Sequence, residues 1–186
     1  MPAAAVAIGA ALMVAPSATP AVAGTCAAST TCPTTVTFTV TAPDSLTITV
    51  PDGPVPIGGN TPGNPVTGQL GLITVSDQRA SLTATWTATV SATAFTTGGG
   101  TAAETIPTTS VQYWSGLATA TTGTGTFVPG QASAAAAVTL DQPRTAFSKT
   151  TGSGSNSATW NPTVIVNIPA QAVAGTYTGT VSHLVA

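Results

Sequence analysis

The stretch "SLTATWTATVSATAF", residues 81–95, decides the fold class of this chain. Its apolar side chains fall on every second position, and Thr or Ser stands between nearly all of them. This is the period of a β-strand, which places alternate side chains on opposite faces of a sheet. The sequence therefore predicts a strand with one hydroxyl-bearing face and one apolar face. The apolar face carries Leu82, Ala84, Trp86, Ala88 and Val90.

The chain is almost free of charge. Its 186 residues include three Lys or Arg, five Asp or Glu and one His, so the net charge is -2 and charged residues make up 4%. Ordinary soluble domains carry about 25%. Three cations cannot follow a nucleic-acid backbone or hold an anionic membrane surface, so we expect no nucleic acid among the partners. Solubility must come from the hydroxyls of Thr and Ser and from the backbone.

Residues 1–23 are rich in Ala and uncharged, which is typical of the apolar part of a signal peptide. A transmembrane anchor is the alternative. The run is shorter than the roughly 20 residues that span a bilayer, and it contains Pro16 and Pro20. We therefore expect export, cleavage after Ala23, no membrane association afterwards and one mature domain over residues 24–186.

Two cysteines, Cys26 and Cys32, follow the predicted cleavage point in "CAASTTC". A close pair of cysteines in an exported chain is typical of a structural disulfide. No His or carboxylate stands near them, which argues against a zinc site, and their spacing differs from that of a redox motif. We predict a disulfide that restrains the N-terminal end of the mature chain.

Further runs with the period of a strand follow, separated by turns rich in Gly and Pro. No run has a convincing helical period. About eight such strands predict an all-β fold, an antiparallel β-sandwich of immunoglobulin-like or jelly-roll type, with a closed barrel as the alternative. The predicted strands lie within residues 34–40, 45–50, 70–76, 81–95, 106–116, 135–149, 158–169 and 175–185.

Four features interrupt this pattern. Residues 51–69 contain too much Pro and Gly for a strand and predict a long ordered loop or crossover. Phe95 breaks the parity of its run, which a β-bulge near Thr93–Ala94 would restore. Pro143 cannot donate a ladder hydrogen bond and predicts a broken strand. The Ala-rich residues 131–138 favour at most one helical turn.

Two segments resemble the paired motifs of WxL-domain surface proteins of Gram-positive bacteria. They are "TWTATVSATAFT", residues 85–96, and "AGTYTGTVSHLV", residues 174–185. In that family a Trp-x-Leu strand is followed, much later in the chain, by a terminal strand of similar pattern. The motif positions here are Trp86, Ala88 (where the family has Leu), Tyr177 and His183 (where the family has Trp).

The resemblance implies an exported β-sandwich that associates with the cell envelope without a covalent link. Members of the family bind peptidoglycan, so the resemblance implies cell-wall glycan or another envelope component as the partner. No sorting signal follows Ala186, and we expect no covalent anchoring to the wall.

Aromatic residues are the candidate glycan contacts, because an exposed ring offers a flat apolar surface to a sugar. Tyr113 and Trp114 are adjacent, so a strand directs one of them into the core and the other to solvent. Trp160, at a strand start, is a further candidate, although we expect it to cover the core. Trp86 is expected in the core.

Catalytic chemistry finds little support in the sequence. His183, the single histidine, would have to be the general base for any Ser nucleophile, and no glycine-flanked nucleophile motif is present. The five carboxylates are placed as turn or strand-end residues rather than as the pair that glycoside hydrolysis needs. Asp77 with Arg79, and Asp141 with Arg144, are interpreted as local ion pairs or caps. We expect no enzyme activity, no cofactor and no metal site.

The leading hypothesis is a non-enzymatic, secreted structural or adhesive protein at the cell surface. The first alternative is a subunit of an extracellular fibre that self-associates by β-strand addition. Weakly protected sheet edges and an extended N-terminal segment suit that assembly. The second alternative is a carbohydrate-binding module that uses Trp114 or Trp160.

Overall fold

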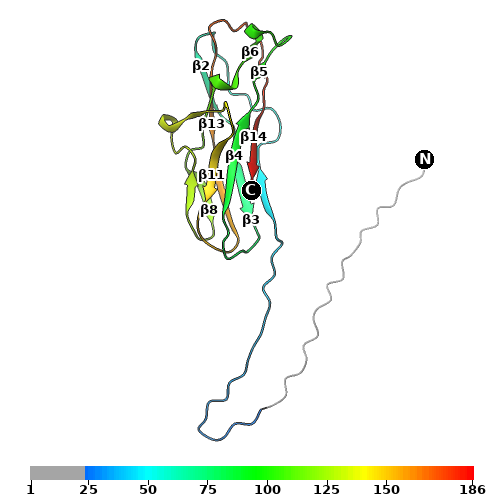
Figure 1. Cartoon of the computed structure of the whole chain (residues 1–186), viewed down its shortest axis with the longest axis vertical. Coiled ribbons are helices and arrows are strands. Elements are labelled where there is room, and N and C mark those ends of the chain that lie inside the picture. Colours follow the sequence, from blue (N-terminus) through cyan, green and yellow to red (C-terminus); the bar gives the residue numbers. More distant parts are fainter. Residues whose placement is uncertain (1–23) are drawn as a thin grey trace, which may run out of the picture. The chain divides into compact units, whose positions relative to one another are not determined.

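The computed structural model describes residues 24–186 (Figure 1). The chain forms two parts, one reaching to Thr39 and the other spanning Val40–Ala186. The signal peptide predicted over residues 1–23 lies outside the described residues.

The N-terminal part is irregular apart from one turn. Cys26 and Cys32 form the predicted disulfide, with 5.8 Å between their Cα atoms. Inside this loop the backbone N–H and the hydroxyl of Thr30 both donate to the carbonyl of Ala27, at 3.3 and 2.6 Å. The predicted strand over residues 34–40 is wrong, because no strand forms over this stretch and it belongs to none of the sheets of the described residues.

The second part folds into an antiparallel β-sandwich, which confirms the predicted fold class. Helical structure within the described residues is limited to the single turns η1 (Ala102–Glu104), η2 (Thr108–Ser110) and η3 (Ala134–Ala136). The strands are β1 (Leu46–Thr49), β2 (Pro65–Gln69), β3 (Ile73–Asp77), β4 (Trp86–Ala92), β5 (Phe95–Thr96), β6 (Thr105–Ile106), β7 (Val111–Trp114), β8 (Ala118–Thr122), β9 (Phe127–Pro129), β10 (Val138–Thr139), β11 (Arg144–Lys149), β12 (Asn156–Trp160), β13 (Thr163–Asn167) and β14 (Val181–Val185).

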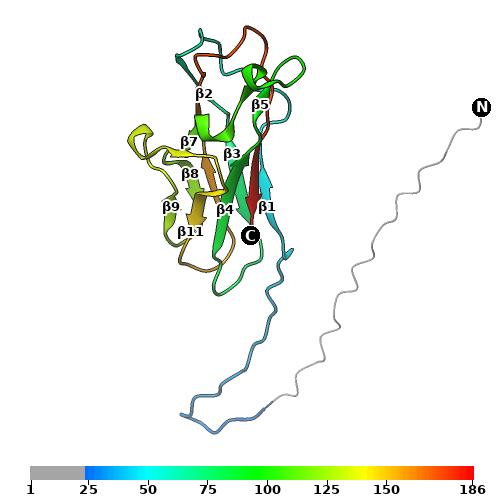
Figure 2. The same ribbon diagram turned by 45° about the horizontal axis from the view of Figure 1, so that its top comes forward.

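Two layers make up the sandwich. One layer is the sheet β14-β4-β11-β9, and Figure 2 shows β4, β11 and β9 of this layer side by side. The other layer consists of the sheets β1-β3-β12-β8 and β10-β7-β13-β2. The short pair β5-β6 extends one end of β4.

The two sheets of the second layer follow each other along the chain and meet at an interruption, here called the kink. The pairs β2 and β3, β12 and β13, and β7 and β8 are consecutive in the chain and keep the same neighbours on both sides of the kink. On the central strand only Asn161 and Pro162 lie at the kink, whereas three residues face them on each flanking strand, 70–72 and 115–117. The N–H of Gly71 donates to Asn161 Oδ1 at 3.1 Å instead of to a ladder carbonyl. The extra residue on each flank interrupts both ladders in the manner of a β-bulge.

Several predictions about individual segments can be compared with the structure. Residues 51–69 are not a loop throughout, because β2 forms at their end. β2 is an edge strand, a position at which Pro65 is tolerated. The β-bulge predicted near Thr93–Ala94 falls at the two residues between β4 and β5, and the predicted break at Pro143 falls between β10 and β11. The Ala-rich stretch forms only the turn η3.

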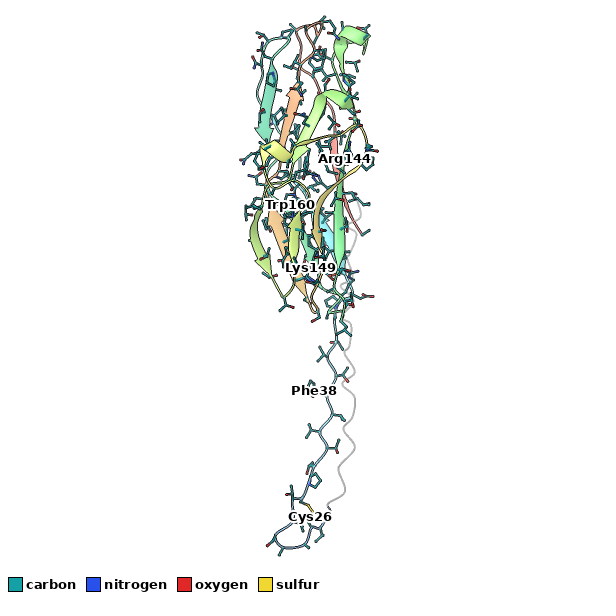
Figure 3. The ribbon with its side chains drawn as sticks, turned by 60° about the vertical axis from the view of Figure 1, so that its left-hand side comes forward. Cys26, Phe38, Arg144, Lys149 and Trp160 are labelled. Atoms are coloured by element: carbon teal, nitrogen blue, oxygen red, sulfur yellow. A yellow bond between two sulfur atoms is a disulfide. The ribbon has the colours of Figure 1, made fainter. Side chains whose placement is uncertain are left out.

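The core between the layers is rich in aromatic rings, of which Figure 3 labels Trp160. Trp160 is fully buried and stacks on Phe147, with ring centroids 4.9 Å apart. Trp86 is buried as predicted, and its ring centroid lies 6.4 Å from those of Phe127 and Phe147. Burial of large rings is the strongest single source of hydrophobic stabilisation in such a core. The other large apolar residues that are fully buried are Ile73, Val75, Val90, Val111, Tyr113, Leu140 and Val164.

Candidate functional site

A buried polar cluster joins the two layers. Its centre is Asp77 on β3, which is fully buried and receives two side-chain hydrogen bonds from Arg79, each 2.9 Å long. Asn156 on β12 donates to the same carboxylate at 3.3 Å and accepts a 2.9 Å bond from the indole N–H of Trp86 on β4. Side chains of β3, β12 and β4 are therefore tied together inside the sandwich.

The ion pair fixes the charge state of this cluster. Hydrogen bonds from Arg79 hold the pKa of the Asp77 carboxyl below its usual value and outweigh the opposing effect of burial. The same contacts raise the pKa of Arg79. Arg79 also donates to the carbonyl of Thr85 at 2.8 Å. The Asp77 carboxylate and the Arg79 guanidinium are thus both hydrogen-bonded within the sandwich, which agrees with the local ion-pair interpretation.

Lys149 on β11 is a further buried charge. Its ammonium donates to the carbonyl of Ala84 at 2.7 Å and lies 5.9 Å from the centroid of the Phe127 ring, within reach of a cation–π contact. Neither Lys149 nor Asn156 was predicted from the sequence to lie in the interior. A signal was present for Lys149, because it shares the strand parity of the apolar Phe147.

The second predicted ion pair holds a crossover between the layers. Arg144 and Asp141 lie 2.7 Å apart near the surface. The hydroxyl of Thr139 donates to the Asp141 carboxylate at 2.9 Å, and this bond, together with Arg144, lowers the pKa of that carboxyl. Arg144 also donates to the Thr139 carbonyl at 2.9 Å. These contacts fix the turn at Pro143, where the chain passes from β10 to β11.

A second line of polar contacts crosses the core from Trp160 to His183. The indole N–H of Trp160 donates to the Tyr113 hydroxyl at 3.3 Å, and that oxygen lies 3.2 Å from His183 Nε2. Burial lowers the pKa of His183 to about 4 and raises the pKa of Tyr113, so both groups are neutral near pH 7. In this state the hydroxyl of Tyr113 accepts from Trp160, and the tautomer of His183 sets which of the two groups donates in the Tyr113–His183 contact.

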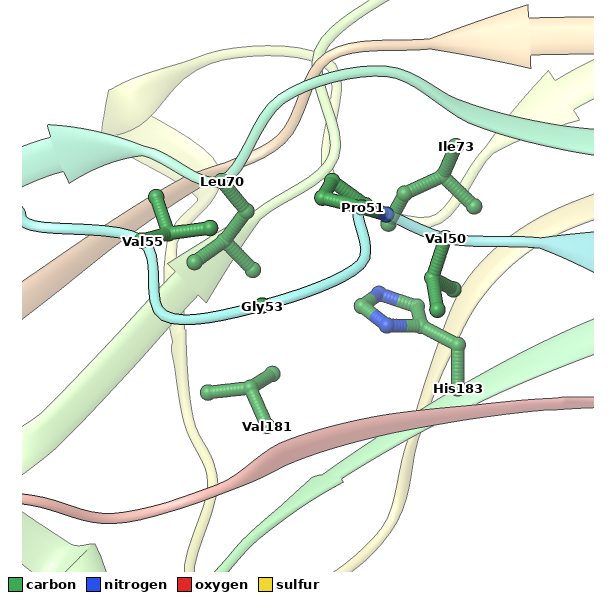
Figure 4. Close-up of a pocket in the computed structure, with 8 residues that line it drawn as sticks. All are labelled: Val50, Pro51, Gly53, Val55, Leu70, Ile73, Val181 and His183. Atoms are coloured by element: carbon green, nitrogen blue, oxygen red, sulfur yellow. The ribbon is translucent and has the colours of Figure 1, made fainter.

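His183 also lines a groove between β14 and the end of β1 (Figure 4). The groove is shallow and open to solvent, and its volume is about 110 Å³. Apart from the imidazole, its side chains are apolar, so it suits an apolar ligand surface better than proton-transfer chemistry. Its lining residues are Val50, Pro51, Gly53, Val55, Leu70, Ile73, Val181 and His183.

The predicted glycan contacts lie in different environments. Tyr113 and Trp160 are fully buried, so neither ring is open to a ligand in this fold. Trp114 points to the face opposite Tyr113, as expected for adjacent strand residues, and is partly exposed. Its ring lies over Gly116, where a Cβ would come within 3.5 Å of it. Of the three predicted residues, Trp114 is the one that a glycan can reach.

The two segments that resemble WxL motifs lie next to each other. β14 pairs antiparallel with β4, and Val185 of the second segment faces Ala88 of the first. Tyr177, just before β14, has its hydroxyl 3.1 Å from the carbonyl of Ala103 and 2.9 Å from that of Val173. The motif residues therefore hold the C-terminal strand onto the sandwich.

Residues 24–186 contain no group of three or more His, Cys, Asp or Glu side chains that could hold a metal ion. Within the same residues, no helix has both the length and the apolar character needed to span a bilayer. No protein-family model, no curated protein and no solved structure matches this chain.

Proposed function

We propose that the protein is an exported, non-enzymatic structural or adhesive protein that is held at the cell surface without a covalent link. The pairing of β4 with β14 carries this proposal, because it joins the two segments that resemble WxL motifs. The disulfide between Cys26 and Cys32 supports an oxidising, extracellular compartment.

The surface chemistry supports the same proposal. Threonine side chains such as Thr87 on β4 and Thr122 on β8 are exposed on the outer faces of the strands. The charges of Asp77, Arg79 and Lys149 are engaged within the fold. A surface of hydroxyls and backbone groups can hydrogen-bond to the hydroxyls and amides of wall glycans, and salt screens such contacts little.

The test is co-sedimentation of the purified protein with purified Gram-positive cell walls, before and after removal of their anionic polymers. We expect binding that persists at high salt, because few charges are available to be screened. A charged wall-binding protein serves as the control, since its binding should fall as salt rises. A protein that stays in the supernatant with every wall preparation would contradict the proposal.

Carbohydrate binding by Trp114 is the second candidate, because its partly exposed ring lies on an outer sheet face. Trp86 and Trp160 are buried, so a change in tryptophan fluorescence on adding a glycan should come from Trp114. We expect the change to vanish in Trp114→Phe and to persist in Trp86→Phe. An unchanged spectrum across a broad glycan panel would remove this candidate.

A further inference from the structure

Three apolar side chains of the N-terminal region have no cover in the described chain. Val36, Phe38 and Val40 are 80%, 85% and 77% exposed, and they alternate with threonines. Figure 3 shows Phe38 on this extended stretch, residues 34–41, here called the free segment. The free segment has the composition and period of a half-buried strand and lacks only a partner.

β14 has unused backbone groups along one side. Ala186 and Thr87 exchange two hydrogen bonds, 3.1 and 2.8 Å long, and the bonded residues alternate from there along the antiparallel pair. The backbone N–H and C=O groups of Val181, His183 and Val185 therefore point away from β4. No ladder joins β14 to any other strand of residues 24–186, although β1 runs beside it.

The apolar groove lies along this same edge. It opens where β1 ends, and Val181 and His183 form its β14 wall (Figure 4). A strand added to β14 directs every second side chain toward the groove and the seam between β14 and β1. Moving β14 and β1 apart breaks no ladder of backbone hydrogen bonds, because the two strands are not paired. Insertion of a strand between them therefore costs less free energy than insertion between two paired strands.

We infer that the free segment of one copy adds as a β-strand to the β14 edge of a second copy. The two strands match in period, because residues 36–40 carry apolar side chains and residues 181–185 carry half-buried side chains at the first, third and fifth positions. With these ends aligned, Phe38 faces His183 in either strand direction. Main-chain hydrogen bonds supply the pairing and the alternating side chains supply the register, as in other strand additions.

A second copy is a better partner than the same chain. The free segment reaches its own seam only through a hairpin turn over residues 41–45, and the described chain forms no strand pair across that turn. Addition to a second copy needs no new turn, and repetition from copy to copy gives a fibre. Self-association of this kind extends the fibre-subunit alternative. It is tested on the purified protein without cell walls, so a negative result here is distinguishable from a negative result in the wall co-sedimentation.

The first test compares Phe38→Asp with the matched control Thr37→Asp by analytical ultracentrifugation of the purified protein. Both changes place one charge in the free segment, but only residue 38 faces the groove in the added strand. We expect concentration-dependent association of the parent protein, at least about tenfold weaker association of Phe38→Asp, and near-parent association of Thr37→Asp. Equal effects of the two variants, or a parent protein that stays monomeric up to its solubility limit, would overturn the inference.

The second test locates the contact with cysteines on the outward face. One variant carries Thr37→Cys, and a second carries either Leu184→Cys or Ser182→Cys, so a mixed disulfide can form only between copies. An antiparallel addition joins residue 37 to residue 184, and a parallel addition joins it to residue 182. A third variant carries both cysteines in one chain. A cross-link that forms only in this variant, within one chain, would show a hairpin instead, and no cross-link in any mixture would show that the edge is not used; either result overturns the inference.

Discussion

Residues 36–40 and residues 86–90 carry nearly the same alternation, and the structure treats them in opposite ways. Trp86 and the apolar residues that follow it on β4 are buried, because β11 and β14 flank that strand and a second layer faces it. Phe38 and its apolar neighbours are exposed. Alternation thus specifies which side chains share a face, whereas burial depends on partner strands that the local sequence does not name.

The largest expected effect tests this contrast directly. Trp86→Ala removes ring contacts with Phe127 and Phe147 and leaves Asn156 Oδ1 without its donor. It should lower the free energy of unfolding by about 3–5 kcal/mol. Phe38→Ala, the matched change in the exposed run, should alter it by less than about 0.5 kcal/mol. Urea unfolding followed by circular dichroism measures both, and similar costs would mean that Phe38 is packed in solution.

The next largest loss of stability is expected at Asp77, a charged residue at a strand position that the alternation assigns to an apolar side chain. Asp77 follows Ile73 and Val75 on the inward face of β3, yet it is a fully buried carboxylate. Asp77→Asn should cost about 3 kcal/mol, because it leaves the Arg79 guanidinium without its charged partner. The control is Asp141→Asn at the exposed pair, which should change stability little. Equal losses in chemical denaturation would contradict the structural role of the buried cluster.

The sequence predicted the class of the fold because period-two alternation is a local property of the chain. The same rule failed at residues 34–40, where a strand pattern has no partner within the described chain. It also missed the kink at Asn161 and Pro162, since an extra residue on each flanking strand becomes visible only when strands are aligned. The groove was hidden for the same reason, because Val50 and His183 meet through tertiary structure alone.

A smaller effect should appear with pH. Burial lowers the pKa of His183 to about 4, so between pH 6.5 and about 4 the unfolded chain binds a proton that the folded chain does not. Stability should therefore fall, on the order of 2 kcal/mol, as the pH drops through this window and stay level above it. The Asp77 carboxyl acts at lower pH, because its folded pKa lies below the usual value. His183→Asn should flatten the slope above pH 4.5 in urea titrations, and an unchanged slope would assign it to another group.

The smallest effect on stability is expected from loss of the disulfide in the N-terminal region. The bond closes a short loop between Cys26 and Cys32, and that loop belongs to the unit that ends at Thr39, whereas the strands of the sandwich all belong to the second unit. Reduction, or replacement of both cysteines by Ser, should therefore shift the melting temperature of the sandwich by less than about 2 °C, since 1 kcal/mol corresponds to about 2–4 °C in a domain of this size. Scanning calorimetry with and without reductant makes the measurement. A larger loss would mean that the N-terminal part packs on its own sandwich, and the apolar side chains of the free segment would then be covered within one chain rather than by a second copy.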